Sequence, residues 1–223
     1  ETGGSDVAAW GLLLNFVPDP DAAVACIRER LGQGGTFAAY VWDYAEGMEF
    51  LRLFWDEAVA FLRDLESIPV DGVMIFPPLL FAWGKVDPSL KVRFFEDLAR
   101  ETKLPIVLFQ IPVKSYYYDP ATICRIAGLE NVVAFKEASF DINLFRDTIQ
   151  ALERDNVQMR VLTGNDRFVA ESYKMGADGA LIGVANVATE KWGALDLAGR
   201  AGNFDQAFAI QNELQGVKEL VFS

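Results

Sequence analysis

Val132-Val133-Ala134-Phe135-Lys136-Glu137-Ala138-Ser139 is the stretch of sequence that decides the fold. It is a short apolar run that ends in a lysine, which is typical of a parallel strand covered on both faces. Because side chains alternate along a strand, we expect Val132, Ala134 and Lys136 to share one face. The lysine then stands at the carboxyl end of a buried strand.

Similar apolar runs recur on both sides of this stretch and alternate with amphipathic helical segments. Repeated strand–helix units favour parallel strands joined by right-handed crossovers, in a doubly wound sheet or a barrel. We predict an α/β fold of TIM-barrel-like (β/α) repeats with about seven parallel strands, one fewer than a closed barrel needs. The barrel is therefore expected to be incomplete or chimeric. The predicted strands are residues 7–16, 36–42, 72–76, 105–111, 132–136, 159–163 and 179–184. The predicted helices are residues 22–31, 48–66, 89–102, 120–127, 141–153, 167–175, 190–201 and 203 to the C-terminus.

The placement of Lys136 suggests a chemical role. The carboxyl ends of the strands build the active site of a barrel enzyme. A lysine there loses contact with water, which lowers its pKa and leaves more free amine to attack a carbonyl. The alternative is a structural lysine that extends to the barrel mouth or pairs with a carboxylate. Placement alone leaves both readings open.

Composition excludes several other classes of function. The 223 residues include no histidine, so the usual general base and metal ligand are missing, and we expect neither a metal site nor a cofactor. The net charge of −12 argues against nucleic acid and anionic membrane surfaces as partners. Two isolated cysteines, Cys26 and Cys124, and the absence of a secretory or membrane-spanning run favour a cytoplasmic location. Residues 1–5 are expected to be a cloning remnant or a truncated start.

Residues 61–222 carry five further motifs. They are Asp71-Gly72-Val73-Met74-Ile75-Phe76-Pro77-Pro78, Pro105-Ile106-Val107-Leu108-Phe109-Gln110-Ile111-Pro112, Val133-Ala134-Phe135-Lys136-Glu137-Ala138-Ser139, Leu162-Thr163-Gly164-Asn165-Asp166, and Gly176-Ala177-Asp178-Gly179-Ala180-Leu181-Ile182-Gly183. Their order and spacing resemble the dihydrodipicolinate synthase / N-acetylneuraminate lyase family of class I aldolases. Each motif is weak alone, but together, across about 70% of the chain, they are specific. The resemblance implies a Schiff-base enzyme that acts on pyruvate or a related 2-keto acid and an aldehyde, with Lys136 as the imine-forming residue.

The resemblance also implies other site residues, with two departures from the family pattern. Gly164 and Asn165 are expected to line the mouth, and Lys114 stands where several members carry an arginine for the substrate carboxylate. Phe109 stands where the family has a proton-shuttling tyrosine, and a phenyl ring cannot carry a proton. The tyrosines at 116–118 are either replacement hydroxyls or a packing cluster. The second departure is larger, because the family's Gly/Thr-rich carboxylate-binding loop is not found in the sequence.

The first quarter of the chain, residues 6–58, carries different motifs, namely Leu13-Leu14-Asn15-Phe16-Val17-Pro18-Asp19-Pro20, the helix and turn at 27–36, and Ala39-Tyr40-Val41-Trp42-Asp43-Tyr44. These motifs resemble part of a class I S-adenosylmethionine-dependent methyltransferase, from its fourth to its fifth strand. Asp21 is expected to help start the helix, and Gly34-Gly35 to end it. Gly32-Gln33-Gly34-Gly35 is not a nucleotide loop, because it follows a helix and precedes a strand.

We therefore hypothesise a chimera joined near residues 55–62, with residues 6–58 and 59–223 forming one continuous domain. Three functions stay open: a Schiff-base lyase or aldolase, a catalytically silent chimeric scaffold, and a methyltransferase. The methyltransferase is disfavoured because its glycine-rich cofactor loop is missing from the sequence. Seven strands leave a sheet edge that must be covered or paired, so self-association into a homo-oligomer is expected.

Overall fold

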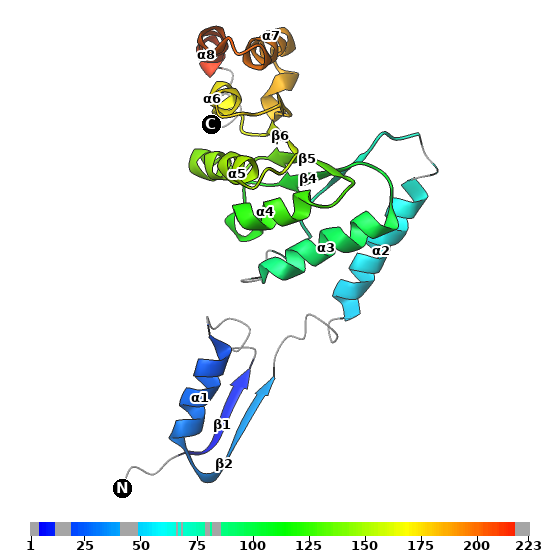
Figure 1. Cartoon of the computed structure of the whole chain (residues 1–223). Coiled ribbons are helices and arrows are strands. Elements are labelled where there is room, and N and C mark those ends of the chain that lie inside the picture. The colour runs from blue at the N-terminus through cyan, green and yellow to red at the C-terminus, as the bar shows by residue number, and fades with distance from the viewer. Residues whose placement is uncertain are drawn as a thin grey trace. The chain divides into compact units, whose positions relative to one another are not determined.

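The computed structural model describes residues 5–11, 19–40, 49–65, 67, 69–78, 81 and 86–216. The chain forms two compact units, Glu1–Glu57 and Ala58–Ser223 (Figure 1). The division falls within residues 55–62, where the two sequence resemblances meet.

The first unit contains a β-α-β element. Strand β1 (Ser5–Gly11) pairs in parallel with β2 (Leu31–Tyr40), and α1 (Pro20–Arg30) connects them. The side chain of Asp19, rather than the predicted Asp21, caps α1 by accepting a hydrogen bond of 2.9 Å from the Ala22 amide. Only a residue placed before the first turn can reach those amides, and Asp21 already lies inside that turn.

The end of α1 also differs from the prediction. The helix is capped at Leu31 and not by Gly34-Gly35, which lie within β2. Gly34 has a φ of +85°, a left-handed conformation that favours glycine, and the ladder between β1 and β2 shifts register between the pairs of Ser5 and Val7. The glycines therefore shape an irregular strand start. The predicted strand ends at 12–16 and 41–42 lie outside the described residues.

The second unit is a five-stranded sheet with helices. Its strands follow the order β3-β4-β5-β6-β7, and every neighbouring pair is parallel. With β1 and β2, the described residues contain seven parallel strands, the number that the sequence predicts, divided into one sheet of two and one of five. Helix α2 (Glu49–Leu65) contains the point at which the chain divides between the units. The elements after it are β3 (Val73–Ile75), α3 (Pro88–Glu101), β4 (Ile106–Gln110), α4 (Pro120–Ala127), β5 (Val132–Glu137), α5 (Ile142–Arg154), β6 (Arg160–Thr163), α6 (Val169–Lys174), β7 (Gly179–Ala180), α7 (Thr189–Arg200) and α8 (Phe204–Glu213).

The last strand is shorter than predicted. The sequence predicts a strand over 179–184, but only Gly179–Ala180 pairs with β6. The backbone then turns into a 3₁₀ helix at Gly183–Asn186, and the Val184 amide donates to Asp166 Oδ1 at 2.9 Å. A side chain has taken the hydrogen bond that a longer ladder would use.

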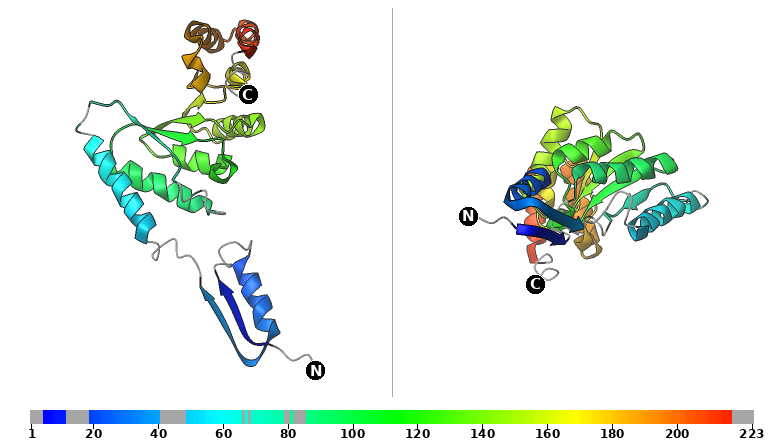
Figure 2. Two further views of the ribbon diagram at one scale, coloured as in Figure 1. Left: turned by 180° about the vertical axis from the view of Figure 1, so that it is seen from behind. Right: turned by 90° about the horizontal axis from the view of Figure 1, so that it is seen from below.

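The two faces of the five-stranded sheet have different environments. Helices α3, α4 and α5 lie in a row along one face, as the opposite views in Figures 1 and 2 both show. On that face Leu108 and Phe135 are 0% exposed. Phe109, Lys136 and Leu162 are register partners on the other face. The side chains of β5 alternate strictly between the two faces only from Ala134 onward. Ile106 pairs with Val132 and Val107 pairs with Ala134, so Val133 is an extra residue that shifts the register.

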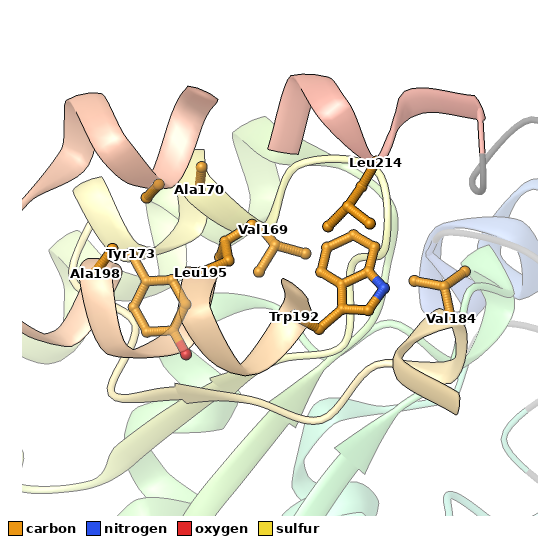
Figure 3. Packing of buried hydrophobic residues seen from close by; sticks show 9 residues of the cluster. Val169, Ala170, Tyr173, Val184, Trp192, Leu195, Ala198 and Leu214 are labelled. Atoms are coloured by element: carbon orange, nitrogen blue, oxygen red, sulfur yellow. The ribbon is translucent and has the colours of Figure 1, made fainter. Parts of the chain in front are cut away.

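A second core is built by the C-terminal helices. Trp192 of α7 packs between Leu214 and Val184, and Tyr173 of α6 lies against Ala198 (Figure 3). Gly199 makes this approach possible, because a Cβ at that position would overlap the Tyr173 ring. The interior glycine costs helix stability, and the close packing of α6 on α7 offsets that cost.

We expect Gly199→Ala to destabilise the protein by about 1–3 kcal/mol, because the new methyl group forces the Tyr173 ring out of its packed position. Gly193→Ala in the same helix is the matched control. Outside the helix's own backbone, no described atom lies within 4 Å of a Cβ there, so the better helix propensity of alanine should stabilise the protein by up to about 1 kcal/mol. Urea unfolding of both variants measures the difference, and two shifts of the same sign would contradict this account.

Candidate active site

Lys136 stands at the carboxyl end of β5, on the face of the sheet that α3, α4 and α5 do not cover. Its strand neighbours are Phe109 on β4 and Leu162 on β6. The Nζ atom lies 4.2 Å from the centroid of the Phe109 ring. Burial lowers the pKa of Lys136, and the negative charge of Asp166 opposes part of this shift. The amine is therefore easier to deprotonate than a surface lysine, as a carbonyl nucleophile requires.

Gly164, the residue after β6, makes room for the lysine stem. A Cβ on Gly164 would lie 2.6 Å from the Ala138 Cβ and 3.1 Å from the Lys136 Cε. The Gly164 amide also donates to the Glu137 carbonyl at 2.6 Å. The predicted site residue Gly164 thus lies directly beside Lys136, and any larger residue would push the lysine chain aside.

A buried polar network lies behind Lys136, on the helix-covered face of the sheet. Its centre is the Glu137 carboxylate, which is 0% exposed. Glu137 Oε1 accepts from Gln110 Nε2 at 2.8 Å and from the Ser139 amide at 2.9 Å. Glu137 Oε2 accepts from Asn165 Nδ2 at 2.6 Å. The network therefore ties the ends of β4, β5 and β6 together at the level of the lysine.

Asn165 belongs to this network. Its side chain is completely buried, with Nδ2 donating to Glu137 and Oδ1 accepting from the Phe140 amide at 2.7 Å. The sequence prediction placed it at the mouth, whereas the structure shows its side chain buried within the network. The same prediction overlooked Gln110 and Glu137. The available signal was a polar residue at the end of two adjacent apolar strands, since a buried polar group needs a partner.

Electrostatics at Glu137 result from two opposed effects. Burial raises the pKa of its carboxyl group, and the hydrogen bonds from Ser139, Asn165 and Gln110 offset only part of this rise. All three partners donate N–H groups to the carboxylate, an arrangement that matches its ionised form.

The loop after β4 joins the same strand ends. Tyr118 donates its amide to Gln110 Oε1 at 2.7 Å, and Tyr117 donates its hydroxyl to the Ser139 carbonyl at 2.6 Å. From the other side, the buried Lys91 donates to the Tyr117 carbonyl at 2.6 Å. Lys114 lies in a 3₁₀ turn of this loop and is exposed. The loop is therefore anchored at its end while the predicted carboxylate ligand faces solvent.

The tyrosines of this loop differ in their surroundings. Tyr118 is 0% exposed, with its ring edge-on to Phe81 and Phe95 at centroid distances of 6.4 and 6.2 Å. Tyr116 is also buried. Burial and the charges of Glu137 and Asp141 raise the pKa of Tyr117. The packing role considered for these rings therefore describes Tyr118, and the Tyr117 hydroxyl holds the chain after β5.

Among the described residues, no three His, Cys, Asp or Glu side chains gather in a way that could hold a metal ion. No helix in the described part of the chain is both long and apolar enough to cross a membrane.

Comparison with known proteins agrees with this geometry. Residues 55–223 match the model of the dihydrodipicolinate synthetase family. A 4-hydroxy-tetrahydrodipicolinate synthase of Moorella thermoacetica is 31% identical over 153 residues, which cover 68% of this chain and 50% of that protein. The corresponding enzyme of Methanococcus maripaludis is 28% identical over 74% of this chain and 55% of its own length. The chain thus spans about half the length of these relatives.

Solved structures show the same likeness. Dihydrodipicolinate synthase from Bacteroides thetaiotaomicron superposes with a TM-score of 0.65 at 28% identity, over 74% of this chain and 54% of that one. The enzyme from Thermotoga maritima superposes with a TM-score of 0.69 at 20% identity, over 98% of this chain and 83% of that one. The α/β fold matches that of these barrel structures, and the five-stranded sheet of the described residues is an incomplete barrel. On the family match over residues 55–223, this chain belongs to the dihydrodipicolinate synthetase family.

Proposed function

We propose that this chain carries the lysine-bearing half of a class I lyase or aldolase that forms a Schiff base with pyruvate or a related 2-keto acid. The observation that carries the proposal is Lys136, half-buried at the end of β5 with a lowered pKa. Family membership supports the substrate class, since the similar proteins are named 4-hydroxy-tetrahydrodipicolinate synthases. The second substrate is an aldehyde, as the resemblance implies.

In the proposed reaction, the uncharged Nζ of Lys136 attacks the C2 carbonyl of the keto acid. A C–N bond forms, the carbonyl oxygen leaves as water, and a protonated imine results. Loss of a proton from C3 gives an enamine, whose C3 attacks the aldehyde carbon and forms a C–C bond. Water then hydrolyses the imine, which restores the carbonyl and the free lysine. Cleavage runs through the same steps in reverse.

Other residues of the chain have supporting roles in this proposal. Lys114 is the candidate for the substrate carboxylate, as a point charge without the bidentate geometry of arginine. Phe109 cannot relay the C3 proton, because its ring has no ionisable group. The Glu137 network holds the strand end so that Nζ points at one position in space, which is the preorganisation that an attack on carbon requires.

The proposal also covers the cellular compartment and the oligomeric state of the chain. The free thiols of Cys26 and Cys124 support a reducing, cytoplasmic compartment. An unpaired edge at β3 or β7 of the described sheet supports self-association into a homo-oligomer. The methyltransferase resemblance of residues 6–58, and the chimera that it suggests, stay predictions. The family match begins at residue 55, and a β-α-β element is common to both folds.

Borohydride trapping tests the central proposal. With pyruvate present, we expect the hydride to reduce the imine to a stable amine, adding the pyruvate-derived group to Lys136 in a peptide identified by mass spectrometry. Lys136→Ala should abolish the adduct, whereas Lys174→Ala, which removes an exposed lysine of α6, should leave it unchanged. An absence of adduct in folded wild-type protein would favour the alternative, a catalytically silent scaffold.

The pH dependence of trapping reports the state of the lysine. The free amine reacts, so the rate should rise with pH around a midpoint below 10.5, the ordinary pKa of lysine. Asp166→Asn removes the negative charge that raises this pKa and should move the midpoint lower by about 0.5–1 unit. The asparagine Oδ1 can still accept from the Val184 amide, so the fold is kept. An upward shift would contradict the role given to Asp166.

The Glu137 network gives a further prediction. In Glu137→Gln, the new NH₂ group must face a donor whichever way it turns. Asn165 cannot reverse its amide because Oδ1 accepts from Phe140, and Gln110 cannot because Oε1 accepts from Tyr118. We expect a loss of about 1–3 kcal/mol in the free energy of unfolding and slower trapping at Lys136.

Glu130→Gln is the control for that substitution, because Glu130 is exposed. It should change stability by less than about 0.5 kcal/mol. Equal stability of the two variants in urea unfolding would rule out a strained network at Glu137.

A further inference from the structure

Two phenylalanine rings stand next to the Lys136 amine. Phe109 is nearly buried, and its ring centroid lies 4.2 Å from Nζ. Phe76, at the end of β3, meets Phe109 edge to face with a centroid distance of 4.8 Å and an interplanar angle of 79°. Phe76 itself is 61% exposed. The rings form a continuous apolar surface, the aromatic wall, that begins at the nucleophile and extends across β4 to β3.

The local sequence fixes the position of this wall. Phe76 precedes Pro77-Pro78, and a residue before proline is restricted to extended backbone. Both prolines are buried, so the chain after β3 is anchored. An exposed phenylalanine on a fixed backbone loses little conformational entropy when a ligand covers it. The wall is therefore preorganised.

The distances set which part of a substrate meets the wall. The C2 atom of a bound keto acid is bonded directly to Nζ, and Nζ already contacts the Phe109 ring. Groups two or three bonds beyond C2 therefore reach Phe109 and then Phe76. A hydroxylated or carboxylated chain would exchange water for phenyl surface there and lose hydrogen bonds. A flat aromatic ring would gain edge-to-face contacts and bury the exposed part of Phe76.

We propose that the aromatic wall of Phe76 and Phe109 selects substrates whose 2-keto acid chain, or the aldehyde joined to it, bears an aryl group. Position 109 carries a phenylalanine where the sequence resemblance implies a tyrosine, so it offers apolar surface in place of a hydroxyl group. Phe76 is then the specificity-determining residue, and Lys136 keeps its role as the nucleophile. This inference rests on the proposed Schiff-base function.

The test compares the concentrations of four keto acids that give half-maximal borohydride trapping at Lys136 in the full chain. The acids are pyruvate, 2-oxohexanoate, 2-oxoglutarate and 2-oxo-4-phenylbutanoate. We expect the phenyl compound to need about a tenfold lower concentration than 2-oxohexanoate, which matches an aromatic contact of about 1.4 kcal/mol. 2-Oxoglutarate should need the highest concentration of the four.

Variants then assign the preference to the wall. Phe76→Ala should bring the phenyl compound within about twofold of 2-oxohexanoate, and Phe76→Leu should do nearly the same, because it restores apolar area but no ring. Phe61→Ala is the matched control, since Phe61 is 63% exposed on α2, and it should keep the full preference.

The outcomes separate this inference from the function on which it rests. An adduct on Lys136 with pyruvate but no preference for the phenyl compound would overturn the wall and leave the Schiff-base proposal standing. A preference that survives Phe76→Ala would do the same. An absence of adduct with every keto acid would reject the Schiff-base function, and the wall with it.

Discussion

The burial of the Glu137 carboxylate is the constraint on which the candidate site depends. An ionised group without water needs several donors, and these come here from the ends of β4 and β6 and from the chain after β5. Lys136 precedes Glu137, so alternation along β5 aims the lysine away from the network. The backbone that carries Lys136 is therefore held by contacts on the opposite face of the sheet. Such a network tolerates few substitutions, because each amide in it is held in one orientation by a second partner.

The second determinant of the site is the balance of charge around Lys136. Burial favours the neutral amine, while Asp166 and the facing Phe109 ring favour the ammonium ion. A nucleophile benefits from the first effect, but a protonated imine is also a cation and benefits from the second. Groups that oppose deprotonation of the lysine thus stabilise the intermediate that forms on the same nitrogen. The two effects serve different steps of the proposed reaction.

Much of the fold could be predicted from periodicity, because parallel strands read as short apolar runs. The five strands between residues 73 and 180 begin within one residue of their predicted starts. The predicted element ends were wrong where side chains compete with backbone carbonyls for the same amide hydrogen bonds. Asp166 takes the amide of Val184 and ends β7 early, and Asp19 caps α1 because of its distance from the first turn. An apolar run gives no sign of the register shift at Val133. The sequence therefore could not show whether Val132 shares a face with Lys136.

The position of the candidate nucleophile could be predicted from the sequence, but the residues that hold it could not. Lys136 and Gly164 are adjacent in space, as the motifs imply. Asn165 follows Gly164 in the chain and yet turns to the opposite side of the sheet, since its amide completes the coordination of Glu137. Sequence order cannot distinguish a residue that lines a site from one that holds it, because both are polar and both follow a strand. The distinction comes from burial: a polar side chain with every donor and acceptor engaged has none left for a substrate. By that criterion Asn165 supports the site, whereas the amine of Lys136 and the exposed ring of Phe76 stay open to a substrate.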